Sequence, residues 1–254
     1  MSVTNNIAVV ILAAGKGKRM KNPDMAKVMY EVGNKPMISY VVELSKKINP
    51  ARLIIVVGWQ RQMIIDYFKS KNERVEFAEQ LEQLGTGHAV MQTQELLKNF
   101  TGLVLILSGD VPLLTYSTVK RMIDECSANN ADAVILTTEM DDPTGYGRIV
   151  RGSDNAVLKI VEHKDAEPEI LKIKEINSGI YLFDTPKLFE ALKHLKPDNA
   201  QNEYYLTDVF EYFWKNKYKV IAVKSEDPLE IMGINDATQL ELARKIFEKR
   251  TPNS

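Results

Sequence analysis

Short apolar runs alternate with helical patterns through the first half of the chain. The runs are near-continuous stretches of Val, Ile and Leu, which is typical of strands buried on both faces of a parallel sheet. Between them, apolar residues recur about every 3.6 positions, which indicates amphipathic helices. The predicted strands are 7–12, 53–57, 75–78, 103–107 and 133–138, and the predicted helices are 37–48, 60–68, 88–97 and 117–126.

The pattern changes after residue 140. Further strands at 148–150, 156–161 and 179–183 follow without full helices between them, and helices return at 187–195, 206–214 and 237–249. The alternation predicts a doubly wound α/β fold with a mostly parallel, Rossmann-like sheet. We expect a single domain over 1–254, in which 1–140 forms the larger part, 141–235 a smaller lobe on the carboxyl edge of the sheet, and 236–254 a C-terminal helix and tail.

The composition of the chain limits the kinds of partner and the cellular location that we expect. The 254 residues are 44% hydrophobic and 26% charged, as in ordinary globular proteins, and the net charge of −1 without a long basic run argues against nucleic acid. No apolar stretch approaches the roughly 18 residues of a membrane span. The start lacks the basic region of a secretory signal, and the single cysteine, Cys126, suits a reducing compartment, so we expect a cytoplasmic protein. We interpret Cys126 as a buried helix residue and not a nucleophile.

The first strand runs into residues 12–20, LAAGKGKRM. Small residues and glycines let the backbone come close to a ligand and turn its N–H groups toward an anion. Lys16, Lys18 and Arg19 add positive charge where a triphosphate would lie. A dinucleotide fingerprint is excluded because its third glycine is replaced by Met20, and a Walker loop is absent. We favour phosphate binding over the alternative, a strand-to-helix turn with a solvated basic face.

Asp110 follows the apolar run 103–107, where ligands bind outside the carboxyl ends of the strands. Alone it would be a turn or N-cap aspartate ahead of Pro112. The glycine-rich loop opens onto the same edge, however, and Mg²⁺ needs few protein ligands because it keeps waters and phosphate oxygens. The three histidines are too scattered for a catalytic or metal cluster: His88, His163 and His194.

Later segments carry further motifs in a specific order. After 12–20 and Lys27 come 82–89 (EQLGTGHA), 109–113 (GDVPL), 145–149 (GYGRI), 160–165 (IVEHKD), 175–179 (EINSG) and 203–208 (EYYLTD). Each motif alone is weak, but the ordered set spans nearly the whole chain. It resembles the sugar nucleotidyltransferase family, and within it the N-acetylglucosamine-1-phosphate uridylyltransferases, the pyrophosphorylases that make UDP-N-acetylglucosamine. In the bifunctional bacterial members this unit is the N-terminal half.

The resemblance implies that 1–140 is the nucleotide-binding part and 141–235 the sugar-binding lobe, with UTP and a sugar 1-phosphate as partners. It also implies roles for individual residues. The nucleotide site would comprise Leu12, Ala13, Ala14, Gly15, Gln80, Gln83, Gly85, Thr86 and Gly109, with Gln80 facing the uracil edge. The amino-sugar pocket would comprise Gly147, Glu162, Asn177, Tyr205 and Thr207. Arg19, Lys27 and Asp110 would be catalytic, and Asp110 and Asn235 would hold the cofactor Mg²⁺. Without the resemblance, Gln80 and Gln83 would be loop residues, Glu162 and Asn177 strand-end residues, and Tyr205 a core aromatic.

The resemblance implies transfer from UTP to N-acetylglucosamine 1-phosphate with release of pyrophosphate. The alternatives are another hexose 1-phosphate, such as glucose 1-phosphate, or a non-catalytic sugar-nucleotide-binding domain. The chain departs from the family at Ala26, where the family usually has proline, and the loop before Ala26 is one residue longer. It also has Ser108 where the family often has tyrosine. It shows no hexapeptide periodicity after residue 235, unlike the acetylating β-helix of bifunctional members. We therefore expect no acetyl transfer and a monomer or weak dimer.

Overall fold

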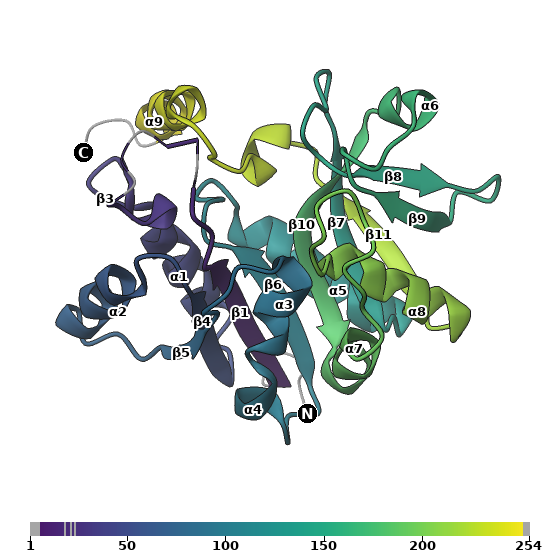
Figure 1. Ribbon diagram of the computed structural model, residues 1–254, viewed down its shortest axis with the longest axis horizontal. Helices are drawn as coiled ribbons and strands as arrows, with labels where there is room; N and C mark the ends of the chain where they lie inside the picture. The colour runs from purple at the N-terminus through teal and green to yellow at the C-terminus, as the bar shows by residue number, and fades with distance from the viewer. Residues whose placement is uncertain (1–5, 18, 21, 23, 251–254) are drawn as a thin grey trace.

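The main sheet contains nine strands, with helices on both of its faces (Figure 1). The computed structural model describes residues 6–250 apart from 18, 21 and 23. Seven of the strands run side by side in the order β11-β7-β10-β6-β1-β4-β5. Their bounds are β1 (Ile7–Ala13), β4 (Arg52–Val57), β5 (Glu76–Glu79), β6 (Leu103–Ser108), β7 (Ala133–Glu139), β10 (Glu175–Asp184) and β11 (Val220–Lys224). All neighbouring pairs except those made by β10 are parallel, so the predicted doubly wound α/β fold is confirmed.

Strand β1 lies in the middle of the sheet and is buried on both faces. Ile7, Val9 and Ile11 enter one hydrophobic core, whereas Ala8 and Val10 enter the other, and all five are fully buried. The first core is covered by α1 (Met37–Lys47), α2 (Arg61–Ser70) and α5 (Tyr116–Asn129). The second is covered by α3 (Thr86–Met91), α4 (Gln94–Leu97), α7 (Thr185–Leu192) and α8 (Val209–Lys215). Because side chains alternate across a strand, a continuous apolar run has to serve both cores.

Strand β10 runs antiparallel between β6 and β7 and joins the two sides of the sheet. Its reversed direction places its first residues at the edge where the parallel strands end. The register slips between Asn177 and Tyr181, a β-bulge that reorients the side chains there. The sequence predicted only 179–183 as strand, because the polar segment 175–178 lacks the apolar pattern of a buried strand.

The segment 141–235 builds two different parts of the molecule. The strands β8 (Arg148–Arg151) and β9 (Val157–Val161) form an antiparallel pair that extends away from the sheet, followed by α6 (Pro168–Leu171), as Figure 1 shows. The same segment also supplies β10 and β11 to the main sheet. Strand β11 was not predicted, and it pairs parallel with β7 at the edge, where three of its five residues are only partly buried.

Two predicted helices differ from the structure. The expected helix 88–97 is divided into α3 and α4, because the Thr93 hydroxyl donates to the Val90 carbonyl over 2.7 Å and competes with the helical pattern. The expected helix 206–214 begins with the 3₁₀ turn η3 (Leu206–Asp208) before α8. In the described part of the chain, no helix is long and apolar enough to cross a membrane.

The C-terminal segment folds back over the carboxyl edge of the sheet. After η4 (Pro228–Ile231), helix α9 (Ala237–Arg250) packs beside the short strands β2 (Glu31–Val32) and β3 (Lys35–Pro36) (Figure 1). The 3₁₀ turn η2 (Lys27–Met29) immediately precedes β2. A third hydrophobic cluster joins these parts through Met20, Val32, Met37, Leu113, Met232, Ile234, Leu240 and Ala243. Segments from both ends of the chain therefore meet at one edge.

The cysteine has the environment expected from the sequence. Cys126 is buried on α5, and its thiol donates to the Ala131 carbonyl at 3.3 Å. Burial raises the pKa of the Cys126 thiol to about 11, which keeps it protonated at neutral pH. The structure thus supports a packing role and not a nucleophilic one.

Phe183 of β10 tests how much the packing between β10 and α8 contributes to the stability of the fold. It is fully buried and lies against Phe210 and Phe213 of α8, with ring centroids 5.2 and 5.6 Å apart. Phe183→Ala should lower the free energy of unfolding by about 3–5 kcal/mol, because it leaves a cavity at this junction. Phe183→Leu is the matched control and should lose clearly less. Equal losses in urea denaturation would contradict a tightly packed junction.

Candidate active site

A cleft of about 540 Å³ opens where β1 and β6 end. Leu12 pairs with Ser108 in the parallel register, and the Gly109 N–H donates to the Leu12 carbonyl over 2.9 Å, so the two following loops leave the sheet together. The chain turns from β1 toward β4 on one side, whereas β6 lies on the other. Such a reversal of strand order is where open α/β sheets bind their ligands.

Most of the residues expected to bind nucleotide line this cleft. They are Leu12, Ala13, Ala14, Gly15, Gln80, Gln83, Gly85 and Thr86, joined by Lys27 and Asp110. Two expected residues are not part of the lining. Gly109 instead holds β6 to β1 through its backbone, and the Arg19 side chain is exposed to solvent. Lys18 lies outside the described residues.

The glycine-rich loop lies directly against Lys27. Gly17 has a φ of +58°, and a Cβ built there would be 2.8 Å from the Lys27 Cβ. Both the backbone angle and the lack of space therefore require glycine. Lys16, on the same loop, also lines the cleft, and its ammonium is 5.5 Å from the centre of the Trp59 ring. Lys16 from the loop and Lys27 from the segment beside it thus both line the cleft.

The amide of Gln80 is held in a defined orientation. The residue is only 3% exposed, and its Nε2 donates to the Gly85 carbonyl at 2.9 Å and lies 3.2 Å from Nδ1 of His88. The side chain of Gln83 donates to the Gln80 carbonyl at 3.0 Å. Since protein groups occupy the amide nitrogen of Gln80, its Oε1 is the atom that remains to accept from a ligand.

The loop at Gly85 forms a wall of the cleft and also fastens it to the segment 203–207. Gly85 has a φ of +110°, and a Cβ there would lie 2.6 Å from the Tyr204 carbonyl oxygen. The Gly87 N–H donates to that same oxygen over 2.8 Å, and the Thr86 hydroxyl accepts from the Leu206 N–H over 3.0 Å. Thr86 is thereby held at the boundary between the cleft and the pocket beside it.

A second, smaller pocket of about 180 Å³ adjoins the cleft, and Leu12, Thr86 and Ser108 line both. Four of the five residues expected to bind sugar lie on it, namely Gly147, Glu162, Asn177 and Thr207. Tyr205 does not line either cavity. It is buried, and its hydroxyl accepts from Nε2 of Gln201 at 2.8 Å. Tyr205 therefore lies behind residues that line the cavities, such as Gln201.

The polar groups of the smaller pocket are partly engaged with one another. The Thr207 hydroxyl donates to Glu162 Oε1 over 3.1 Å, and Asn177 Nδ2 donates to the Tyr181 hydroxyl over 2.6 Å. Burial raises the pKa of Glu162, although the hydrogen bond from Thr207 opposes the shift. The side chains thus present a mixture of acceptors and donors, which suits a ligand with several hydroxyl groups.

The expected metal ligands meet at the mouth of the cleft. The Ile234 N–H donates to the Asp110 carbonyl over 2.9 Å, which brings Asn235 beside Asp110. The Asp110 carboxylate and Asn235 Oδ1 both accept from the Lys27 ammonium, the latter at 2.9 Å. Two hard oxygen donors converging on one cation fit Mg²⁺, which takes few protein ligands. Among the described residues, no group of three or more His, Cys, Asp and Glu side chains offers a richer site.

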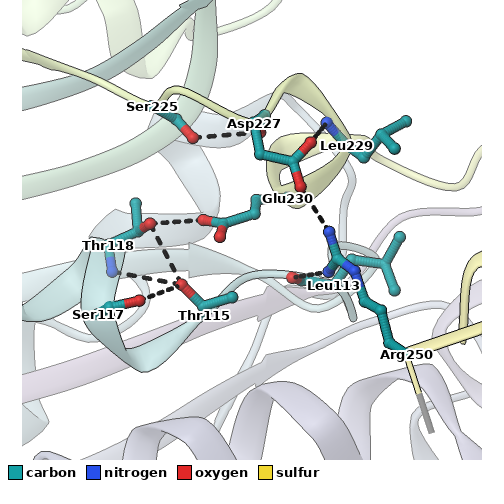
Figure 2. A network of polar contacts seen from close by, with 9 residues as sticks. All are labelled: Leu113, Thr115, Ser117, Thr118, Ser225, Asp227, Leu229, Glu230 and Arg250. Carbon is teal, nitrogen blue, oxygen red and sulfur yellow. Dashed lines mark hydrogen bonds and ion pairs between the residues drawn. The ribbon is translucent and has the colours of Figure 1, made fainter. Parts of the chain in front are cut away.

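Figure 2 shows polar contacts that hold η4 and the end of α9 against Leu113 and the beginning of α5. Arg250, at the end of α9, donates to the Leu113 carbonyl at 3.3 Å and to Asp227 at 2.6 Å. The Thr118 hydroxyl, on α5, donates to the Glu230 carboxylate on η4. Two of these contacts join η4 and the end of α9 to α5 and the loop before it, 112 and 137 residues away in the sequence. They help to hold the segment that carries Asn235 beside the loop after Asp110.

Two residues near the cavities were given no role from the sequence. Lys164 lines the large cleft and donates to Gln201 across it at 2.5 Å. Arg148 is only 2% exposed and donates to the Tyr146 carbonyl, behind the loop that borders the smaller pocket. Both lie within the motifs quoted for the family, and a basic residue one or two positions after an expected pocket residue was the signal that could have identified them.

Fold and cleft together define a doubly wound α/β protein with a glycine-rich loop and an open cleft at the switch point of its sheet. The model of the nucleotidyl transferase family matches residues 8–228, and the chain belongs to this family. It is 45% identical over 245 residues to bifunctional protein GlmU of Geobacter metallireducens and 44% identical over 245 residues to that of Enterococcus faecalis. The matches cover 96% of this chain but 51% and 53% of those proteins, so the chain spans about half their length.

The fold also occurs among solved structures. A UDP-glucose pyrophosphorylase in complex with UDP-glucose superposes with a TM-score of 0.78, covering 97% of this chain and 100% of that one. The two sequences are 19% identical, so this likeness concerns the fold alone.

The raised pKa of Glu162 predicts a pH-dependent cost in stability. The folded protein holds this proton more tightly than the unfolded chain, so stability falls as pH rises from the ordinary value of 4.5 through the folded pKa. Glu162→Gln removes the cost and should raise the melting temperature at pH 7, with a gain that disappears below pH 4.5. The control Glu167→Gln removes the charge of an exposed carboxylate nearby. It should leave the melting temperature unchanged both at pH 7 and below pH 4.5. A Glu162→Gln gain that is independent of pH would contradict the assignment.

Proposed function

We propose that this chain transfers the uridylyl group of UTP to N-acetylglucosamine 1-phosphate, giving UDP-N-acetylglucosamine and pyrophosphate. One observation carries the proposal. A large cleft, lined by a glycine-rich loop of the kind that binds phosphate, adjoins a small polar pocket. Leu12, Thr86 and Ser108 line both cavities. A nucleotide in the first and a sugar in the second would meet at this boundary with their phosphates together. Proximity and orientation of this kind provide a large part of the rate enhancement in group transfer.

Gln80 supports uracil as the base. Its Nε2 is engaged with Gly85 and His88, so its Oε1 is the atom that can accept a hydrogen bond from a ligand. Uracil presents an N–H donor at its pairing edge, whereas cytosine presents an unprotonated nitrogen there. The cytosine nitrogen would face the Gln80 oxygen without a hydrogen bond between them. Because two buried acceptors would then be unpaired, binding of a cytosine nucleotide is disfavoured.

The reaction needs alignment and charge compensation more than acid–base catalysis. An oxygen of the sugar phosphate is already an anion, so it forms the new bond to the α-phosphorus without a general base. The bond from the α-phosphorus to the bridging oxygen of pyrophosphate breaks, and pyrophosphate leaves with that electron pair. Lys16, Lys27 and Lys164 line the cleft, and Arg19 is exposed beside the glycine loop. In our proposal these cations orient the phosphates and stabilise the charge that develops.

We further propose that the metal is Mg²⁺ and that Asp110 and Asn235 hold it. Proteins of the family generally use a divalent metal. The convergence of one carboxylate and one amide oxygen supports this assignment. Bound there with the triphosphate, the ion would supply charge neutralisation on the departing phosphates.

The relatives support N-acetylglucosamine 1-phosphate over other sugars, since the proteins at 44–45% identity are bifunctional GlmU proteins. The mixed donors and acceptors around Glu162 and Asn177 are compatible with the amide and hydroxyl groups of such a sugar. We also propose that the chain works in the cytoplasm as a monomer or weak dimer. A free cysteine and the lack of a membrane-crossing helix among the described residues are consistent with that location.

A pyrophosphate-release assay over four nucleoside triphosphates and several sugar phosphates tests the proposal. UTP with N-acetylglucosamine 1-phosphate should give the highest kcat/KM. Asn177→Ala should raise the KM for the sugar phosphate about five- to tenfold, as for loss of one hydrogen bond, with little change in UTP binding. A higher kcat/KM with glucose 1-phosphate would replace the sugar assignment. Release with no pair would favour a non-catalytic binding domain.

Asp110→Ala tests the metal site. Turnover should fall on the order of 10²-fold or more, because the variant lacks the carboxylate that would hold the ion, whose positive charge would compensate the negative charge developing on pyrophosphate. Asn235→Ala should cost about tenfold, since water can replace an amide oxygen. Turnover in millimolar Mg²⁺ and the melting temperature should be measured on the same samples. A folded Asp110→Ala variant that keeps most of its activity would show that Asp110 only shapes a turn.

A further inference from the structure

Lys27 occupies the position between the two oxygens that we assign to the metal. Its ammonium donates to the Asp110 carboxylate and to Asn235 Oδ1, 83 and 208 residues away in the sequence. The Lys27 and Asp110 side chains are only 15% and 16% exposed, so water screens the pair little. In this arrangement the lysine is the cation of the site.

The site does not have enough negative charge for a second cation. Among the residues that the structure describes, Asp110 is the one carboxylate that pairs with Lys27, and no cluster of three potential metal-binding side chains occurs. A divalent ion on the same oxygens would lie close to the ammonium, and like charges at such distances repel strongly when they are partly buried. The ion and the ammonium therefore compete for Asp110 and Asn235.

A triphosphate would remove this competition. Its phosphates would lie along the glycine loop, and the Lys27 side chain is next to that loop, because a Cβ on Gly17 would be 2.8, 3.4 and 3.6 Å from its Cβ, Cγ and Cδ. Rotation about the flexible end of the side chain is enough to turn the ammonium from Asp110 toward a phosphate lying on the loop. The phosphates also provide oxygen ligands and negative charge for the ion.

We propose that Lys27 closes the metal site of the nucleotide-free protein, so that the divalent ion binds only together with the nucleotide. This rests on the metal site of the proposed function and not on the identity of the sugar. It assigns Lys27 a second task besides contact with phosphate. The coupling follows from one cation replacing another on the same two oxygens, and it prevents the empty protein from accumulating metal.

Mn²⁺ titration of the nucleotide-free protein, followed by the electron paramagnetic resonance signal of free Mn²⁺, tests the proposal. Mn²⁺ is the probe because it prefers the same oxygen ligands as Mg²⁺. Lys27→Met should bind Mn²⁺ at least about tenfold more tightly than the wild type, since the oxygens no longer have to release an ammonium ion. The gain should disappear in Lys27→Met/Asp110→Asn. Lys16→Met removes a cation from the same cleft that lies over Trp59 and should leave Mn²⁺ affinity unchanged.

Equal Mn²⁺ affinity of the wild type and a folded Lys27→Met variant would overturn the proposal, as would the same gain in Lys16→Met. If Lys27→Met does not fold, Lys27→Gln is neutral and polar and should show the same increase. A melting-temperature rise with added Mn²⁺ in the Lys27 variants, absent in the wild type, provides the second readout. None of these measurements involves a sugar phosphate. A chain that binds metal as predicted but makes no UDP-sugar would contradict the proposed function alone.

Discussion

The parallel pairing of β1 with β6 is the contact on which the site depends. It continues past the strands through the hydrogen bond from Gly109 to Leu12, so the glycine loop and the Asp110 loop leave the sheet side by side. Buried backbone groups at such an edge require partners, which leaves little freedom in the separation of the two loops. The large cleft lies between them, and the smaller pocket shares Leu12 and Ser108 with it. Both candidate binding pockets therefore derive from one strand pair.

The antiparallel strand β10 extends this arrangement into the smaller pocket. Because it runs against its neighbours, its first residues lie at the edge where the others end. Asn177 thereby reaches the same edge as Ser108, although it is at the beginning of its strand and Ser108 is at the end of another. The β-bulge that follows Asn177 is a local irregularity in a sheet that is otherwise regular there, and such irregularities are frequent beside active sites.

The C-terminal segment completes the site from outside the sheet. Its position is specified by hydrogen bonds of Ile234 with Asp110, of Glu230 with α5 and of Arg250 with the loop after Asp110. Each hydrogen bond is of modest strength, and they are combined with the third hydrophobic cluster. The cluster supplies most of the attachment and the polar contacts specify its geometry. The ligands proposed for the metal thus come from a rigid strand end and from a more peripheral segment.

The sequence by itself determined the central strands, most of the helices, the class of fold and the order of the motifs. These features depend on local periodicity and on buried apolar runs, which any segment such as 103–107 displays without its neighbours. Most of the residues to which the family resemblance gave nucleotide or sugar roles line the two cavities, and the roles themselves stay predictions. The positions of Tyr205 behind the wall, of Lys164 in the cleft and of Lys27 between Asp110 and Asn235 were decided only by the tertiary structure. Each depends on contacts between segments distant in the chain, and no local pattern specifies which side chain fills a given space when the segments meet.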